Sequence, residues 1–350
     1  NALEKESRDE SFKIVAEISS QQLVVLMDHI FTNSITFEPD AIVCFVSRLC
    51  EVAKAELFQS DPPRPFTLQK ILEVAYYNIN RTRIVWNKIW SILSPFLIEV
   101  SSFEDEQISL FCIDSIRQLS CKFLERKEFR NFNFQSEFFK PFEHIIIHNR
   151  YKSVRELGLR CILNIIHSYG QNIRSGWKIV LNIITHACTF NEPELEEIAF
   201  SSLASIVDNC FEPAATCFDD VLQCVVKFSF YANSEKINSR ALKLFEVFFQ
   251  NFCKCENINK LFSSDEFTSY SPEQLRWEFG WKKIILILIR VIQEGNSKNR
   301  AEAIYVLFNI LKLHAPEFSG QLWRNIFKIL HSILHVVEHE GYACVTPSVT

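Results

Sequence analysis

The sequence predicts an all-α protein, an α-solenoid of stacked antiparallel helix pairs of the HEAT or armadillo kind. Three observations predict this fold. Only 7 of the 350 residues are glycine, whereas average usage would give about 24, so glycine-rich phosphate loops and sheets joined by glycine hairpins are disfavoured. Alternating strand patterns are nearly absent. Apolar residues recur at three- and four-residue spacing, in segments that repeat along the chain.

The first helix of each expected pair is marked by one of five apolar segments with the same texture. Their starts lie 46, 41, 42 and 61 residues apart, against about 40–47 residues for HEAT and armadillo repeats, and the long last step leaves room for an inserted loop. The segments are Ile108–Leu124, Val154–Gly170, Leu195–Phe211, Ile237–Phe252 and Lys298–His314.

The second helix of a pair is expected to begin with tryptophan. Ser175–Cys188 and Gln321–Leu334 both place a Trp near their start, and similar helices begin near Trp86 and Trp281. Each pair would bury its apolar stripes on its neighbours, which is how a solenoid builds a continuous core.

Helix breakers divide the chain. The proline-rich Asp61–Pro65, the Asn191–Pro193 turn and a loop ending at Ser271-Pro272 separate the helical blocks, with Asp265 or Ser271 as the expected N-cap. The predicted regions are a frayed segment 1–20, a first helical block 21–60, repeat regions 66–190, 191–262 and 272–339, and a disordered tail 340–350.

The net charge of −5 argues against a nucleic-acid binder, which usually carries a basic excess. The charge is uneven, however. Residues 117–160 hold a local surplus of +5, and residues 191–226 hold eight acids and no Lys or Arg. Each block is either a solvated helix face or a partner-docking surface.

The 12 cysteines include no CxxC pair. Cys112, Cys161, Cys188 and Cys224 sit inside apolar helical patterns, where a free thiol behaves as a small hydrophobic side chain. The sequence shows no signal peptide and no apolar run of about 18 residues. A reducing, cytoplasmic compartment is expected. Because the sequence begins on Asn, we expect a region of a larger protein.

Metal motifs are sparse. His335, Glu338 and His339 match the HxxEH pattern of zinc peptidases. Apart from the adjacent Glu340, no Asp, Glu or His follows as a third ligand, so a solvated or half-buried helix face is the preferred interpretation. The CxC at Cys253 and Cys255 is expected to be structural. No cofactor and no metal are predicted.

The aromatic cluster from Phe129 to Phe142 is interpreted as a linker between two helices. Linkers usually run polar. These phenylalanines are therefore either packed against neighbouring repeats or exposed for a partner.

Several blocks, in one order, carry a resemblance to a known family. The blocks include Ile116–Arg126, Asn131–Gln135, Phe139–Ile145, Arg155–Leu157 and Asn172–Lys178. The chain, over about residues 20–335, resembles the region downstream of the catalytic domain in the large Arf guanine-nucleotide exchange factors of the Sec-seven and brefeldin-A-inhibited exchange protein family.

The resemblance implies a non-catalytic helical scaffold that regulates an upstream exchange domain, with region 66–190 as the first downstream homology region. It implies recruitment from the cytoplasm to trans-Golgi membranes in vesicle transport. The implied partners are a GTP-loaded Arf GTPase, the anionic membrane surface and the chain's own exchange domain, with homodimerisation through regions outside this sequence as a further possibility. No nucleic-acid partner is implied.

The basic block and the aromatic cluster overlap, so a GTPase or acidic-lipid surface is expected there. Its predicted residues are Arg117, Arg126, Arg130, Phe132, Lys140 and Arg150. Two alternatives stay open: a zinc-dependent hydrolase built on the HxxEH motif, and a HEAT-type adaptor for another small GTPase.

Overall fold

The computed structural model describes residues 25–60, 62–125, 134–255 and 270–343, and side chains are described as far as His331. Within these ranges the chain forms helices and turns and no strand. The all-α prediction is confirmed. The chain divides into two compact units, residues 1–126 with 140–145, and residues 127–139 with 146–350.

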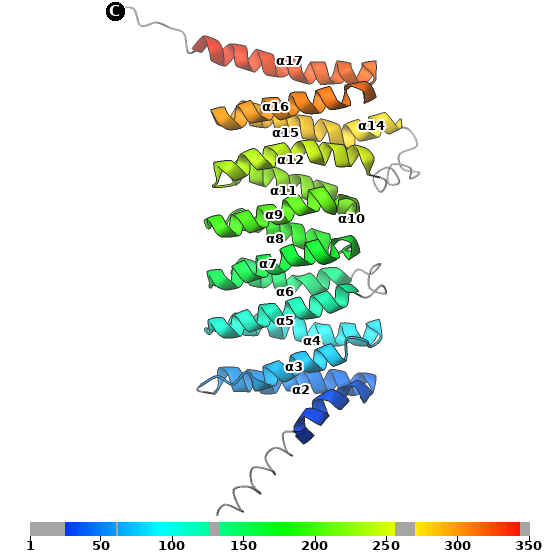
Figure 1. Ribbon diagram of the computed structural model, residues 1–350, viewed down its shortest axis with the longest axis vertical. Helices are drawn as coiled ribbons and strands as arrows, with labels where there is room; N and C mark the ends of the chain where they lie inside the picture. Colours follow the sequence, from blue (N-terminus) through cyan, green and yellow to red (C-terminus); the bar gives the residue numbers. More distant parts are fainter. Residues whose placement is uncertain (1–24, 61, 126–133, 256–269, 344–350) are drawn as a thin grey trace, which may run out of the picture. The chain divides into compact units, whose positions relative to one another are not determined.

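Unit 1 is built from two helix pairs (Figure 1). The helix α2 (Pro39–Phe58) packs on α3 (Phe66–Tyr77) and on α4 (Arg83–Ser101), and α4 packs on α5 (Glu106–Glu125). The helices α3 and α5 pack only lightly on each other, because the two pairs meet chiefly through α2 and α4. A helix covers residues 25–32, and η1 (Asn33–Thr36) follows it.

A clamp around Arg81 fixes the entry to the first pair. Its Nη2 donates hydrogen bonds to the carbonyl oxygens of Ser34, Ile35 and Phe37 at 3.0, 3.0 and 2.7 Å. Beside it, the buried Asn78 side chain donates to Ser34 Oγ at 2.9 Å. The carbonyls that end η1 are thereby satisfied by the loop between α3 and α4.

Unit 2 continues the same construction over more helices. The helix α6 (Phe134–His148) is shared between the units, since its residues 140–145 belong to unit 1. The remaining helices are α7 (Lys152–Tyr169), α8 (Trp177–Ala187), α9 (Pro193–Asn209), α10 (Phe211–Ala214), α11 (Phe218–Tyr231), α12 (Glu235–Lys254), α14 (Pro272–Arg276), α15 (Lys282–Glu294), α16 (Ser297–His314) and α17 (Gly320–Ala343). Short turns of tighter or wider helix connect them: η3 (Gly170–Asn172), η4 (Ala215–Cys217), η6 (Trp277–Trp281) and η7 (Ala315–Glu317).

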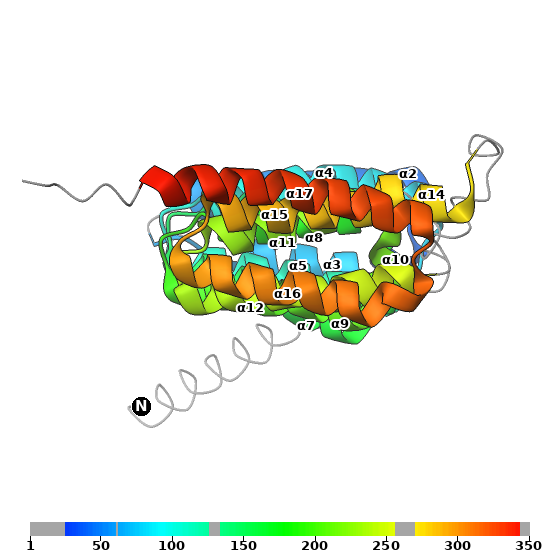
Figure 2. The ribbon, with the colours of Figure 1, turned by 90° about the horizontal axis from the view of Figure 1, so that it is seen from above.

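The helices of unit 2 form two layers (Figure 2). In one layer α7, α9, α12 and α16 contact one another in succession. In the other layer α8 contacts α11, and α15 contacts α17, while α8, α11 and α15 each pack on α9, α12 and α16 respectively. Short connections between packed neighbours make the pairs antiparallel. This arrangement is an α-solenoid, as predicted, and its first-layer helices coincide with the repeating segments.

The expected tryptophan-led helices are present, and three of their four indoles are core side chains, whereas Trp323 of α17 is half-buried. Trp86, Trp177 and Trp281 are at most 2% exposed. A glycine before two of them permits close helix approach: a Cβ at Gly176 would lie 2.6 Å from the Phe139 ring, and one at Gly280 would lie 2.1 Å from the Phe252 ring. Both distances are far inside van der Waals contact.

Two sequence-based boundaries need correction. The cluster from Phe129 to Phe142 is expected to be a linker, but its described part, from Phe134 onwards, lies in α6. Phe138, Phe139 and Phe142 lie on one face of that helix and are buried, so helical spacing, not loop composition, governs them. The tail was expected to begin at residue 340, whereas α17 extends to Ala343. The N-cap prediction is confirmed at Ser271, which forms a capping box with Gln274.

None of the helices in the described ranges combines the length and the apolar content needed to cross a bilayer.

Replacing Gly280 with alanine should lower the free energy of unfolding by about 1–3 kcal/mol, the usual cost of overpacking a core. The Phe252 ring has no room to retreat, because it is 2% exposed and packs on Phe218 with ring centroids 4.9 Å apart. Urea unfolding followed by circular dichroism measures the loss.

The matched control for that change is Gly320→Ala at the start of α17, where an added Cβ meets no atom within 4 Å. It should be neutral or slightly stabilising, because alanine favours helix over glycine. Equal unfolding free energies for the two variants would contradict the close-approach argument.

Candidate functional site

Unit 1 holds an open groove of about 690 Å³ between α3 and α5. Its position follows from the packing: the two pairs meet chiefly through α2 and α4, and α3 and α5 pack only lightly on each other. The groove is lined by Gln69, Leu72, Glu73, Tyr76 and Tyr77 of α3 and by Phe111, Ser115, Arg117, Gln118, Leu119, Cys121 and Lys122 of α5.

Aromatic rings and cations share this groove. Tyr76 is 46% exposed, and its ring meets Tyr77 edge-on with centroids 6.4 Å apart. Across the groove, Arg117 and Lys122 of α5 also line it, at successive turns of the helix. Amphipathic aromatics beside Arg are the side chains that most often anchor protein interfaces.

The cations of the groove are held by neighbours on their own helix. Arg117 pairs with Asp114 at 2.7 Å and Lys122 with Glu125 at 3.1 Å. The hydrogen bond from Lys122 to Glu125, with the Glu125 charge, raises the pKa of the lysine, so it stays charged. Exposed pairs of this kind contribute about 0.2–1 kcal/mol, so a partner's carboxylate can compete for either cation.

The predicted site residues fall in different places. Arg117 lines the groove in unit 1. Lys140 is an exposed residue of α6, and Arg150 is exposed before α7 in unit 2, with its guanidinium 5.7 Å from the Tyr151 ring centroid. Arg126, Arg130 and Phe132 lie outside the described residues. The structure therefore brings no two of the six together in one described contact.

Sequence reasoning missed the aromatic side of the groove. The helix α3 itself offered a signal. Leu68, Leu72 and Tyr76 follow one another at one-turn spacing and run from buried through half-buried to exposed. An apolar row that continues beyond the core-facing side of a helix indicates a second contact surface.

The aromatic cluster, by contrast, is used inside the fold. Buried Gln135 donates a hydrogen bond to the carbonyl oxygen of Asn172 at 2.9 Å and accepts one from the N–H of Arg174 at 2.6 Å. Phe139 fills the space left by Gly176. Residues of three blocks that carry the family resemblance therefore meet in unit 2. The phenylalanines of the cluster whose side chains are described are packed against neighbouring helices rather than exposed for a partner.

The charged blocks also pair internally. Acids of the negative block bind cations from neighbouring helices: Lys152 to Glu194 at 2.6 Å, Arg155 to Glu192 at 2.6 Å, Lys283 to Asp219 at 2.6 Å, and Arg240 to Glu197. The opposite local charges of residues 117–160 and 191–226 thus complement each other from α7 to α9, in addition to facing solvent.

Glu196 of α9 is the buried acid of this block, with 0% of the residue exposed. Its Oε1 accepts a hydrogen bond from the N–H of Asn233 at 2.7 Å, at the start of α12. Burial raises the pKa of Glu196, and the N–H groups of Asn233 and Ser234 oppose that shift. Glu196 therefore links two first-layer helices through a carboxyl group in an environment that disfavours its charge.

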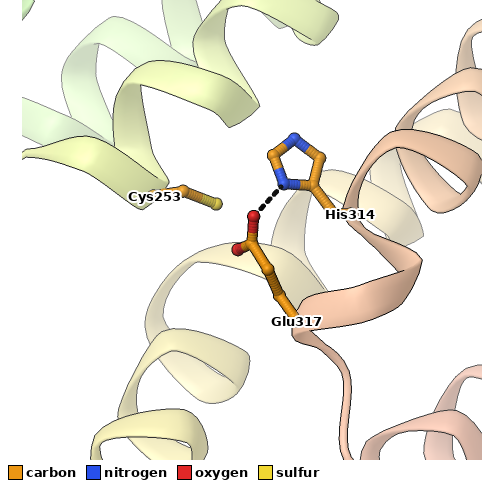
Figure 3. A group of neighbouring side chains, drawn as sticks. All are labelled: Cys253, His314 and Glu317. Atoms are coloured by element: carbon orange, nitrogen blue, oxygen red, sulfur yellow. Dashed lines mark hydrogen bonds and ion pairs between the residues drawn. The ribbon is translucent and has the colours of Figure 1, made fainter.

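A second cluster lies where α12, α16 and η7 meet (Figure 3). The Cys253 sulfur, a His314 ring nitrogen and a Glu317 carboxylate oxygen all lie within 4.8 Å of one another. His314 Nδ1 is 3.1 Å from Glu317 Oε1, and Trp281 Nε1 donates to Cys253 Sγ at 3.3 Å. No histidine lies near this CxC in the sequence. The fold brings His314 beside Cys253. The HxxEH side chains of His335, Glu338 and His339 lie outside the described ones.

Comparison with known proteins identifies the family of this chain. A family model described as Mon2/Sec7/BIG1-like, HDS matches residues 122–205, which run from the end of α5 into α9. The human brefeldin A-inhibited guanine nucleotide-exchange protein 1 is 35% identical over 323 residues, covering 91% of this chain and 17% of that protein. The chain belongs to the BIG-type Sec7 family. The Arabidopsis thaliana brefeldin A-inhibited guanine nucleotide-exchange protein 1 agrees, at 33% identity over 95% of this chain and 20% of that protein.

The chain spans about a fifth or less of the length of these BIG-type relatives. Among solved structures, a designed armadillo repeat protein is 14% identical with a TM-score of 0.33, covering 80% of this chain and 98% of that one. This likeness is too low to support the fold, which rests on the helix packing described above.

The Glu196→Gln variant should gain stability relative to the unchanged protein as the pH rises from about 4 towards 7, measured as the unfolding free energy of the variant minus that of the unchanged protein. Because the pKa of Glu196 is raised in the folded state, ionisation stabilises the unfolded chain as the pH rises through the ordinary glutamate range, and stability is lost. Glutamine keeps the acceptor oxygen but cannot ionise. Urea unfolding at several pH values measures the difference.

The control is Glu194→Gln, which should change with the opposite sign. The hydrogen bond from Lys152 lowers the pKa of Glu194, so its ionised form stabilises the fold above the ordinary glutamate range, and the variant loses this as the pH rises. Parallel pH profiles for the two variants would contradict the assignment.

Proposed function

We propose that this chain is a non-catalytic regulatory scaffold within an Arf guanine-nucleotide exchange factor of the Golgi. In this proposal the parent protein carries the exchange activity elsewhere. The chain itself binds a GTP-loaded Arf GTPase and, with the anionic membrane surface, holds the exchange factor on the trans-Golgi membrane. Membership in the BIG-type family supports the scaffold role.

The observation that carries the docking site is the α3–α5 groove. It combines exposed Tyr76 and half-buried Phe111 with Arg117 and Lys122, on helices that pack on α2 and α4. A folded partner that inserts a side chain there would gain aromatic burial and an ion pair at one place. The ion pairs of Arg117 with Asp114 and of Lys122 with Glu125 are exposed and therefore weak competitors.

Charge reversal at Arg117 should weaken binding to GTP-loaded Arf by about tenfold or more, the scale of an interface anchor. Purified chain is immobilised, and Arf loaded with a non-hydrolysable GTP analogue or with GDP is passed over it. Tyr76→Ala should give a loss of similar size, because the two side chains line the same groove.

The matched control is Lys88→Glu on α4. Lys88 is an exposed cation of the same unit, paired with Asp40 at 3.1 Å, and it does not line the groove. Binding by the Lys88→Glu variant should equal that of the unchanged chain. If Arg117→Glu and Tyr76→Ala also bind normally, the groove is not the docking site. Preference for a different small GTPase in the same assay would favour the adaptor role instead.

The membrane part of the proposal rests on the basic residues around α6. Arg126→Glu with Arg130→Glu should reduce sedimentation with vesicles containing phosphatidylserine, because each Lys or Arg near an anionic leaflet contributes about 1 kcal/mol. Lys140 and Arg150 are exposed and are expected to add to this attraction. Vesicles of neutral lipid serve as the control, and unchanged sedimentation would remove the membrane from the proposal.

A further inference from the structure

The cluster of Cys253, His314 and Glu317 has the donor set of a metal site. Its three candidate ligands are a thiol, an imidazole and a carboxylate, and they come from the last turn of α12, the last residue of α16 and η7. Zinc accepts sulfur, nitrogen and oxygen donors together, whereas magnesium and calcium require oxygen alone. The residue types therefore select a zinc-class cation.

The distances fit with a small adjustment. Zinc bonds of about 2.3 Å to sulfur and about 2.0–2.2 Å to nitrogen and oxygen put tetrahedral ligand atoms about 3.5 Å apart. The three atoms lie within 4.8 Å of one another, so the longest of their separations must shorten by at most about 1.3 Å. The Glu317 side chain is 48% exposed and is free to move towards the other two ligands. Figure 3 shows its carboxylate between the sulfur and the imidazole ring.

The surroundings hold the other two ligands in place. His314 is 7% exposed, and its ring lies against Phe249 with centroids 4.8 Å apart. Trp281, placed by the wide helical turn η6, donates its N–H to Cys253 Sγ. A hydrogen bond to a ligating sulfur is a common outer-shell feature that orients a ligand before the metal arrives.

The charge of the site suits a divalent cation. Burial raises the pKa of Cys253 to about 11, so the free thiol is neutral. A bound metal deprotonates such a thiol, and the released proton goes to solvent. The resulting thiolate and the Glu317 carboxylate then carry two negative charges against the two positive charges of the metal. With a neutral His314, the filled site has no net charge to bury.

We propose that Cys253, His314 and Glu317 bind one zinc-class divalent cation, with solvent in the fourth position. The ion would cross-link the end of α12 to the turn after α16, two neighbouring helices of the same layer. This site is separate from the α3–α5 groove and does not depend on GTPase docking.

Cobalt and zinc are the probes. Metal-free chain titrated with Co²⁺ should show thiolate-to-cobalt charge-transfer absorption that saturates at one equivalent of cobalt. Added Zn²⁺ should displace the cobalt, abolish this absorption and raise the unfolding temperature of the chain. Cys253→Ser should abolish the absorption. Glu317→Gln should weaken zinc binding at least tenfold, because glutamine retains the hydrogen-bonding geometry but not the charge.

Two variants separate this site from others. Cys217→Ser removes a half-buried cysteine outside the cluster, and His339→Ala removes a residue of the HxxEH motif. Both variants should bind one equivalent of Co²⁺ with the affinity of the unchanged chain. The exposed position of Glu317 keeps its variant folded, which circular dichroism checks. The proposal is overturned if no thiolate absorption appears, if it persists in Cys253→Ser, or if Glu317→Gln leaves zinc affinity unchanged.

Discussion

Close packing between successive helix pairs is the constraint on which the structure depends. Each pair has too little core of its own, so it must bury its apolar stripes on the next pair. Where helices approach most closely, glycine faces an aromatic ring, as Gly176 faces Phe139 and Gly280 faces Phe252. A β-carbon at either position would push the layers apart. Close packing of helices therefore explains why two of the few glycines directly precede Trp177 and Trp281.

Polar contacts between the pairs follow the same repeat. Acids on α9 bind cations on α7 and α12, and Glu196 accepts a backbone hydrogen bond from the start of α12. Gln135 performs the corresponding role between α6 and the turn before α8. The charged and aromatic blocks that look like docking surfaces in the sequence are thus largely used to set the spacing of the array. The groove between α3 and α5, which pack only lightly on each other, is the surface that we propose for a partner.

The family relationship gives these contacts a biological setting. The BIG-type relatives are much longer than this chain, which spans about a fifth or less of their length. A groove lined by tyrosine, arginine and lysine offers a surface for a folded partner, and a cation site between α12 and η7 would stiffen another part of the same chain. The two features lie on different helices and can be tested separately.

The sequence by itself determined the helical fold, the repeat and the family, because apolar spacing, helix breakers and tryptophan placement are local properties of the chain. It also pointed to Arg117, which lines the α3–α5 groove. It could not determine which charges and aromatic rings are consumed by packing, because that depends on which helices become neighbours. Phe139 and Gln135 were indistinguishable from surface residues until Gly176 and Arg174 lay beside them. The meeting of Cys253 with His314 and Glu317 was likewise decided by the tertiary structure alone, since only the stacking of α16 on α12 brings together residues so far apart in the chain.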